Sequence, residues 1–191
     1  MYNRKNSHYW SRENPRLFRP CNPQRRFSVN VWCGFIDSRI VGPVFYQGAL
    51  TGDRYVEMLT ATLGEFLDDL NLVDRQQILF QQDGAPAHNV RQIHNLLHDL
   101  FDGRYLSTNG PIRMPPRSPD ITPMDFFFWG FVKNAVYERR YDTLEDLQQS
   151  ISHAINDIDG RIIAKATRSV NRRVQKCLEQ EGDVFEHLLR I

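Results

Sequence analysis

Hydrophobic and polar residues alternate in the first part of this chain and later recur every three or four positions. Residues 27–36, FSVNVWCGFI, are β-branched and aromatic with partial alternation, which is typical of a strand. Residues 38–48, SRIVGPVFYQG, predict a second strand that is kinked near Gly42-Pro43. Because only the short polar link Asp37-Ser38-Arg39 joins the two strands, we expect an antiparallel hairpin.

The period changes in the segment that follows the second strand. Apolar residues within 50–70 recur at intervals of three and four, which predicts an amphipathic helix. The short apolar run QILFQQ, residues 77–82, predicts a strand, and residues 89–100 predict another helix with one apolar face. Residues 101–119 form a Gly- and Pro-rich loop with two short apolar pairs, one of which we expect to be an edge strand.

The remainder of the chain has the pattern of helices. Thr122-Pro123 predicts a helix start, with Thr122 as the N-cap and Pro123 at the first helical position. Thr143 predicts the start of the next helix, and a last helix begins near Arg161. Its expected inner face is Ile162, Ala166, Val170, Val174, Cys177 and Leu178. Its expected outer face is basic: Arg161, Lys165, Arg168, Arg172, Arg173 and Lys176.

The order strand, strand, helix, strand, helix, short strand, helices predicts an α/β domain with a mixed sheet and flanking helices. We expect three parts: a basic extension at residues 1–26, the α/β core at 27–140 and a helical region at 141–191. No internal repeat or low-complexity segment interrupts this order.

Composition and charge narrow the class of protein. Hydrophobic residues make up 41% of the 191 positions, which is enough to form a core. No apolar run approaches the ~18 residues that span a bilayer. The three cysteines are widely spaced, which favours reduced thiols over disulfides or a zinc site. Net charge is +6 over residues 1–30 and −5 over residues 31–110, a pattern compatible with a polyanion partner and a cation-binding centre, or with a solvated terminus.

Asp83 is the first candidate for chemistry, because it directly follows the predicted strand in ILFQQDGAPAHN. Ligands of open α/β sheets bind at the carboxyl ends of strands, where this carboxylate would lie. The dipeptide Asp83-Gly84 is also a common turn signal, so the carboxylate has a simpler role as a hydrogen-bond acceptor for the turn. On the dipeptide alone, the turn is the favoured interpretation.

Asp125 is the second candidate, in the first turn of the helix that Thr122 opens. Thr122 and Asp125 have the spacing of a capping box, and a carboxylate at that place also suits the helix dipole. The aromatic residues 126–129 follow directly, which predicts a carboxylate at the edge of the core. A bare charge there is costly unless it is paired or bound to a metal.

The histidines are weaker candidates. His94 and His98 have the spacing of a metal pair on one helix, but no further ligand pattern accompanies them, which favours a structural role. His88 lies five residues after Asp83 at a junction between loop and helix. It would support Asp83, contact a phosphate or simply begin the helix, and the sequence leaves these alternatives open.

Taken together, these segments resemble mariner-like transposases. The blocks VNVWCGFI, GALTGDRYVEML, FQQDGAPAH and PPRSPDITPMDFFFWGFVK occur in the order found in that family, and HYWSRENP, residues 8–15, resembles the segment just ahead of its second strand. The QDGAPAH and PRSPDxTPxD blocks are the most specific, and the likeness is greatest to transposon-derived sequences of insects. The resemblance extends over nearly the whole chain, from about residue 6 to residue 189.

This resemblance implies a ribonuclease-H-like fold whose acidic triad cuts and joins DNA in DNA transposition and integration. Matched by motif, Asp83 is the second carboxylate of the triad and Asp125 is the third, while Asp120 is a helix-entry residue. Carboxylates of this kind bind two Mg²⁺ or Mn²⁺ ions that stabilise the attacking and leaving oxygens. Further residues become candidates for contacts with nucleic acid: His88, Arg113, Arg117 and Lys133. The family also implies a nuclear location and a homodimer of the full-length protein.

The first carboxylate of the triad has no match in this sequence. In the family it lies on the central opening strand, ahead of the HYWS segment with which this chain nearly begins. We therefore expect an N-terminally truncated catalytic domain that lacks this strand, binds metal weakly and is inactive alone. The alternatives are a non-catalytic nucleic-acid-binding remnant or co-opted module of the same fold, and an unrelated ribonuclease-H-like nuclease, against which the SPDxTPxD block argues.

Overall fold

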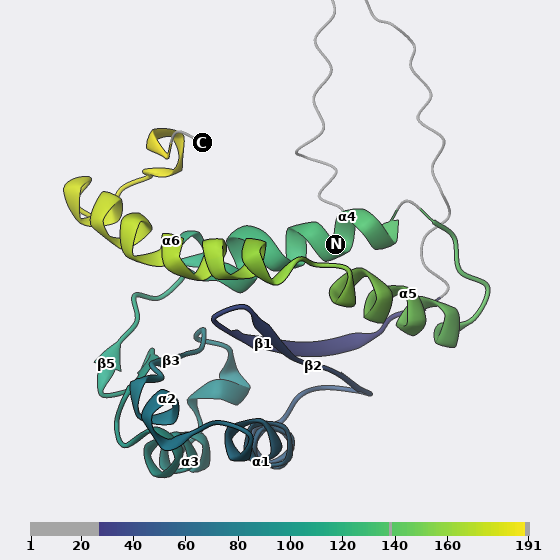
Figure 1. Ribbon diagram of the computed structural model, residues 1–191, viewed down its shortest axis with the longest axis horizontal. Coiled ribbons are helices and arrows are strands. Elements are labelled where there is room, and N and C mark those ends of the chain that lie inside the picture. Colours follow the sequence, from purple (N-terminus) through teal and green to yellow (C-terminus); the bar gives the residue numbers. More distant parts are fainter. Residues whose placement is uncertain (1–26, 138, 190–191) are drawn as a thin grey trace, which may run out of the picture.

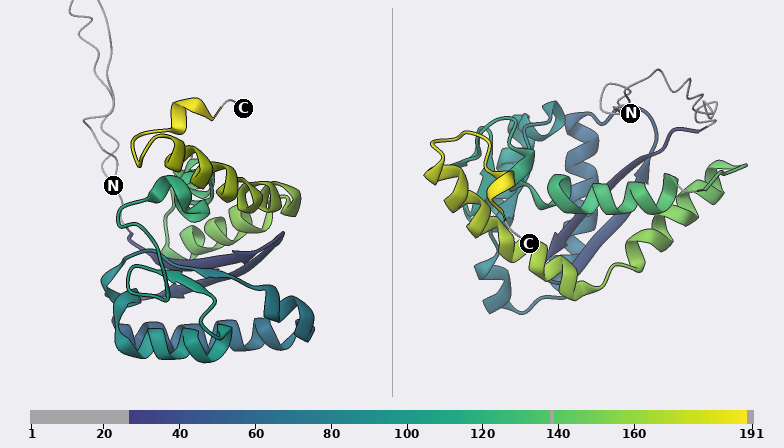
Figure 2. Two further views of the ribbon diagram at one scale, coloured as in Figure 1. Left: turned by 90° about the vertical axis from the view of Figure 1, so that its left-hand side faces the viewer. Right: turned by 90° about the horizontal axis from the view of Figure 1, so that it is seen from above.

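The computed structural model describes residues 27–137 and 139–189, which form three layers. A two-stranded hairpin lies between two layers of helices (Figure 1). One layer contains α1, Gly52–Asp68, and α3, Arg91–Phe101, and the other contains α4, Trp129–Tyr137, α5, Leu144–Asn156, and α6, Gly160–Glu179. The side view in Figure 2 shows the same order of layers. The predicted extension, residues 1–26, lies outside the described residues.

The predicted hairpin is confirmed. Strand β1, Asn30–Ile36, pairs antiparallel with β2, Arg39–Tyr46, and the register shifts between Trp32 and Gly34. Alternate residues of β1 face opposite layers: Trp32 packs toward the α1 and α3 side, and Cys33 packs toward the α4 to α6 side. The hairpin therefore contributes to both cores, which explains why its two faces are both apolar.

The layer below the hairpin is built on a shared apolar core. Helix α1, Gly52–Asp68, and helix α3, Arg91–Phe101, both match the predicted amphipathic patterns. Each helix buries one residue per turn in this core. The fully or nearly fully buried side chains are Tyr55, Leu59, Leu63, Leu67, Ile93, Leu97 and Phe101. The short helix α2, Leu72–Gln77, was not predicted from the sequence, and its N-cap is the side chain of Asn71.

A second, parallel sheet accompanies this layer. Its strands are β3, Phe80–Gln81, β4, Tyr105–Ser107, and β5, Ile112–Arg113, in the order β3-β4-β5. Within the described residues, no ladder joins this sheet to the hairpin. Strand β3 is shorter than the predicted strand at residues 77–82, and both apolar pairs of the following loop form strands where one was expected.

The layer above the hairpin contains the C-terminal helices. Short turns at Pro119–Ile121 and a π-helical turn at Met124–Phe128 lead into α4, Trp129–Tyr137. Helices α5, Leu144–Asn156, and α6, Gly160–Glu179, follow, and a short turn at Glu186–Leu188 ends the described chain. Buried residues of α4, α5 and α6 share one core with the hairpin, which places the predicted helical region 141–191 partly against the predicted core region.

Two details of these helices differ from the prediction. Thr122 does not cap a helix, because its hydroxyl donates to the Ser118 carbonyl at 3.1 Å instead of accepting from the following turn. In α6 the inner face differs at its start: Ile163 is buried and Ile162 is 46% exposed, whereas Ala166 is buried as predicted. Thr143 does cap α5, as predicted, by accepting from the Asp146 amide at 3.0 Å. No helix in the described part of the chain is long and apolar enough to cross a membrane.

Candidate active site

Asp83 lies two residues after the end of β3, on the carboxyl side of the strand, as the sequence predicted. Its Oδ1 accepts a hydrogen bond from the Ala85 amide at 3.0 Å, which is the turn contact that Asp-Gly sequences favour. The same oxygen lies 2.5 Å from His88 Nδ1. No hydrogen bond within the described residues reaches the second oxygen, Oδ2. The turn role and a metal-binding role are therefore compatible, since each uses a different oxygen of one carboxylate.

His88 is positioned as a support for Asp83. Its ring stacks on the Tyr55 ring with centroids 4.3 Å apart, and its side chain is 14% exposed. Tyr55 itself is almost fully buried in the core below the hairpin. Of the alternatives that the sequence left open, the structure places His88 against the carboxylate, and its contact with nucleic acid stays a prediction.

The two glutamines that precede Asp83 connect it to the rest of the molecule. Gln82 is 5% exposed, and its amide nitrogen donates to the His88 carbonyl at 2.9 Å and to Ser107 Oγ at 3.3 Å. The Tyr55 hydroxyl donates to Gln82 Oε1 at 3.3 Å. Sequence reasoning missed this role, although two polar residues at the end of an apolar strand were a visible signal.

Gln81 points the other way and reaches the segment that carries Asp125. Its amide nitrogen donates to the Ile121 carbonyl at 3.2 Å, four residues before Asp125. The strand that leads to Asp83 is thereby bonded directly to the turn that leads into the second carboxylate. Neighbouring residues of a strand face opposite sides, which allows Gln81 and Gln82 to make these two separate connections.

Asp125 lies in the π-helical turn Met124–Phe128 and is exposed. The predicted capping box is wrong, because no side-chain cap forms at this helix start and Thr122 bonds to Ser118 instead. The amides of Asp125 and Phe126 both donate to the Thr122 carbonyl, at 2.8 and 3.0 Å. π-helical turns are rare and occur often at functional sites. This turn leaves the Asp125 carboxylate without a hydrogen-bond partner among the described residues.

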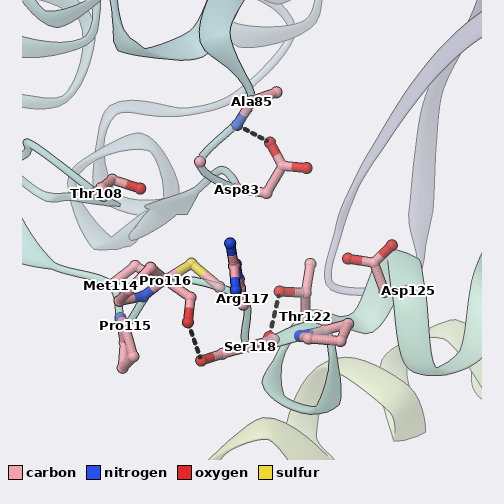
Figure 3. Close-up of a pocket in the computed structure, with 12 residues that line it drawn as sticks. Asp83, Ala85, Thr108, Met114, Pro115, Pro116, Arg117, Ser118, Thr122 and Asp125 are labelled. Carbon is pink, nitrogen blue, oxygen red and sulfur yellow. Dashed lines mark hydrogen bonds between the residues drawn. The ribbon is translucent and has the colours of Figure 1, made fainter.

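Asp83 and Asp125 border the same pocket, which has a volume of about 420 Å³. In Figure 3 the Asp83 carboxylate extends toward the side of the pocket on which Asp125 lies. Both carboxylates offer oxygen atoms, the ligands that Mg²⁺ and Mn²⁺ prefer. The donor chemistry of these two side chains suits a divalent ion that keeps water molecules as further ligands. Residues 27–137 and 139–189 contain no group of three or more His, Cys, Asp or Glu side chains placed to hold a metal ion.

The two carboxylates have opposite pKa shifts. The pKa of Asp83 lies below its ordinary value, first because of its close contact with His88 and also because the Ala85 amide donates to it, which together outweigh partial burial. The pKa of Asp125 lies above its ordinary value, first because of desolvation and then because Asp83 is negatively charged, while Lys133 opposes the shift. Although Asp125 is solvent-accessible, it is thus close enough to Asp83 for their charges to interact.

The predicted basic residues lie at different distances from this pair. Arg117 lines the pocket and adopts a positive φ of 57°, which is unusual for a residue other than glycine. Lys133 is exposed on α4 and acts electrostatically on Asp125. Arg113 is exposed on β5 and does not line the pocket. Arg117 and Lys133 are therefore brought to the carboxylates, and Arg113 lies apart from them.

Comparison of the sequence with known proteins gives two relatives of low identity. The chain is 23% identical over 114 residues to the Mariner Mos1 transposase of Drosophila mauritiana, a match that covers 59% of this chain and 30% of the relative. It is 22% identical over 192 residues to the human histone-lysine N-methyltransferase SETMAR, covering 96% of this chain and 26% of the relative. The chain thus spans less than a third of either relative. No family model matches the sequence.

Comparison of the structure with solved structures gives a closer likeness. The Mos1 transposase catalytic domain, solved with raltegravir and Mg, matches with a TM-score of 0.72 at 18% identity, over 83% of this chain and 77% of that one. The Mos1 paired-end complex with the left transposon end matches with a TM-score of 0.74 at 18% identity, over 94% of this chain and 52% of that one.

The fold is that of the ribonuclease-H-like class, and the predicted fold class is confirmed. Within that class, the sequence and the structure both match part of the Mos1 transposase, so the predicted resemblance to the catalytic domain of mariner-like transposases is also confirmed. The predicted domain boundaries, the missing opening strand and the roles of the site residues stay predictions.

Proposed function

We propose that this chain carries the DNA-cutting and strand-joining site of a mariner-type transposase, with transposon-end DNA as its substrate. The observation that carries the proposal is the meeting of Asp83 and Asp125 at one pocket, from segments 42 positions apart in the sequence. A relative of the same fold has been solved as a paired-end complex with a transposon end, which supports DNA as the partner. A paired-end assembly further suggests that the chain acts as part of a homodimer, and this role implies a nuclear location.

We propose that Asp83 and Asp125 hold Mg²⁺ or Mn²⁺ during this reaction. Mos1 catalytic domains have been solved with both metals, which supports the choice. When bound, such ions supply an activated water and neutralise charge on the phosphate oxygens. The chain's own contribution is orientation: His88 and the Ala85 amide hold one oxygen of Asp83, and the other faces the pocket without a hydrogen-bond partner among the described residues.

Arg117 and Lys133 would bind the phosphates on either side of the scissile bond. Arginine and lysine near a pair of carboxylates keep the local charge from repelling DNA, and their contacts carry no sequence information. Arg117 reaches the pocket directly, and Lys133 lies close enough to influence the Asp125 charge. Arg113 and His88 would have lesser parts in binding, because the first lies outside the pocket and the second is already engaged by Asp83.

Cleavage guided by bound iron tests this proposal without requiring turnover. Fe²⁺ replaces Mg²⁺ at carboxylate sites. With ascorbate and peroxide it generates radicals that cut the polypeptide or the DNA close to the ion. We expect the chain to be cut near residues 83 and 125, and a bound transposon-end duplex to be cut locally. Asp83→Asn and Asp125→Asn should abolish both cuts while DNA is still bound. Cutting that persists in both variants would contradict the proposal.

The second candidate function is a non-catalytic DNA-binding module of the same fold. It is favoured by the small number of ligands, since the described residues contain no group of three or more His, Cys, Asp or Glu side chains placed to hold a metal ion. For the same reason we expect the purified chain not to join strands alone. If it nicks a transposon-end duplex in Mg²⁺ or Mn²⁺ and loses this activity on Asp83→Asn, that expectation is wrong. Binding of DNA without iron-guided cuts would instead support the binding module.

A further inference from the structure

Arg173 of α6 has a set of contacts that its place in a basic helix face does not explain. The side chain of Arg173 is 16% exposed, whereas Arg168 on the same helix is exposed. Its Nη1 donates to the Asp120 carbonyl at 2.7 Å and to Glu186 Oε1 at 3.1 Å. Its guanidinium carbon lies 3.7 Å from the centre of the Phe126 ring, which is a cation–π contact.

These contacts hold the segment that carries Asp125 at both ends. Asp120 lies five residues before Asp125, and Phe126 lies directly after it. Between them the chain makes a short turn and then the π-helical turn, whose backbone hydrogen bonds converge on the Thr122 carbonyl. A segment of such irregular structure needs contacts from outside to fix its geometry. Arg173 supplies these contacts: the edge of its guanidinium group donates to the Asp120 carbonyl, and the face of the group lies on the Phe126 ring.

The C-terminal segment completes this arrangement. Glu186, which accepts from Arg173, follows Phe185, whose side chain is fully buried in a small cluster with Met114 and Ile121. Met114 lines the pocket, and Ile121 accepts the hydrogen bond from Gln81 through its carbonyl. The cluster thus lies beneath the pocket and connects the last described residues to the segments on both of its sides.

We propose that Arg173 is a positioning residue that holds the Asp125 segment in place opposite Asp83, so that both carboxylates reach one metal ion. The metal-binding part of this inference rests on the proposed function, and the bracing of the segment does not. Lysine cannot fully replace the arginine, because an ammonium group has no planar face to lie on the Phe126 ring while it donates to the two acceptors. Arg173 itself does not contact substrate or metal in this account.

Two measurements on the full chain test the proposal. Amide hydrogen exchange of Asp125 and Phe126 reports the bracing, and a Mn²⁺ titration followed by water-proton relaxation reports the joint site. For Arg173→Lys we expect exchange of both amides to be roughly tenfold faster and Mn²⁺ affinity to be roughly tenfold weaker, the size expected for losing a charge-assisted contact. Arg168→Lys, on the exposed face of the same helix, is the matched control and should change neither.

Phe126→Leu removes the ring but keeps an apolar side chain. Like Arg173→Lys, it should accelerate amide exchange at positions 125 and 126. A role confined to overall stability would lower the melting temperature and leave the Mn²⁺ affinity of the folded protein unchanged, which would overturn the positioning role. Wild-type exchange rates in Arg173→Lys would overturn the bracing as well. If the wild-type chain binds no Mn²⁺, the proposed function fails, and the exchange rates alone decide whether Arg173 braces the segment.

Discussion

Asp83 and Asp125 carry the same side chain but affect folding in opposite ways. The lowered pKa of Asp83 means that its ionised form stabilises the folded state at pH above its ordinary value of 3.8, and that this contribution is lost as pH falls through the lower, folded value. The raised pKa of Asp125 means that its ionised form costs stability at neutral pH, and that this cost disappears as pH falls toward and below 3.8.

Substitution by asparagine should therefore change stability in opposite directions. In metal-free buffer at pH 7, we expect Asp83→Asn to be less stable than the wild type and Asp125→Asn to be more stable, each by less than ~1 kcal/mol because the groups are partly exposed. Asparagine can still accept from the Ala85 amide, so Asp83→Asn removes the charge and keeps the turn. Urea denaturation at pH 7 and pH 3 measures both differences.

Both differences should shrink at pH 3, because this pH lies below 3.8: the carboxyl of Asp125 is then mostly protonated, and residue 83 of the unfolded chain binds a proton. His98, which is exposed on α3, offers a control position. The substitution His98→Gln should leave unchanged the stability differences that Asp83→Asn and Asp125→Asn cause. If Asp125→Asn is less stable than the wild type at pH 7, the carboxylate has a structural role instead of a site role.

At Arg117 the backbone conformation disfavours the same side chain that DNA binding would use. Its φ of 57° costs a side chain roughly 1 kcal/mol that glycine avoids. We expect Arg117→Gly to raise the free energy of unfolding by about 0.5–1 kcal/mol and to weaken binding of duplex DNA, with a smaller dependence of affinity on salt. Thermal denaturation and fluorescence anisotropy measure the two effects. Unchanged DNA affinity would remove Arg117 from the proposed interface.

The sequence predicted the two carboxylates and offered His88 as a support for the first, but it did not predict the other residues that hold them. Asp83 and Asp125 were found because one follows a predicted strand, the other begins a predicted helix, and each lies in a specific motif. Gln82 and Arg173 were missed because their roles depend on partners that are far away in the sequence, such as Tyr55 for Gln82 and Asp120 for Arg173. Long-range hydrogen bonds leave no local periodicity from which they can be predicted.

At the scale of elements, the sequence predicted those whose apolar pattern is regular and long. The hairpin, α1, α3 and α5 were predicted because alternation or helical spacing continues over several residues in each. The six residues of α2 are too few for a period, and the π-helical turn follows from packing and not from capping. The first inner residue of α6 was misplaced because Ile162 and Ile163 are both candidates for it, whereas Ala166 was predicted correctly.

Two glycines in helices allow a matched test of how α6 docks on the hairpin. A Cβ at Gly160, the first residue of α6, would lie 2.8 Å from the Ser38 carbonyl oxygen in the hairpin turn. A Cβ at Gly64 in α1 would meet no atom within 4 Å. We expect Gly160→Ala to destabilise the chain by about 1–3 kcal/mol and Gly64→Ala to stabilise it by about 0.5–1 kcal/mol.

Chemical denaturation of the two variants measures these changes under identical conditions. The opposite signs arise because alanine always favours a helix over glycine, so a loss at Gly160 must come from the contact with Ser38. Equal stabilisation by both substitutions would mean that α6 does not lie against the hairpin turn as described.

At the scale of the whole molecule, the candidate site lies where separate parts of the chain meet. Asp83 is held by the parallel sheet and the core below the hairpin, whereas Asp125 belongs to the helices above it. The hydrogen bond from Gln81 to Ile121 and the cluster around Phe185 connect these parts near the pocket. The distance between the carboxylates therefore depends on how the layers pack, which no single segment of the sequence encodes.

The central claim is that Asp83 and Asp125 act together as ligands of one divalent ion, and a Mn²⁺ titration of four proteins tests it most directly. The proteins are the wild type, Asp83→Asn, Asp125→Asn and the double variant. If the carboxylates share one ion, each single substitution should weaken Mn²⁺ binding nearly as much as the double substitution does, because the effects of residues in one site are not additive. Wild-type affinity in the double variant, or strictly additive losses, would contradict the claim.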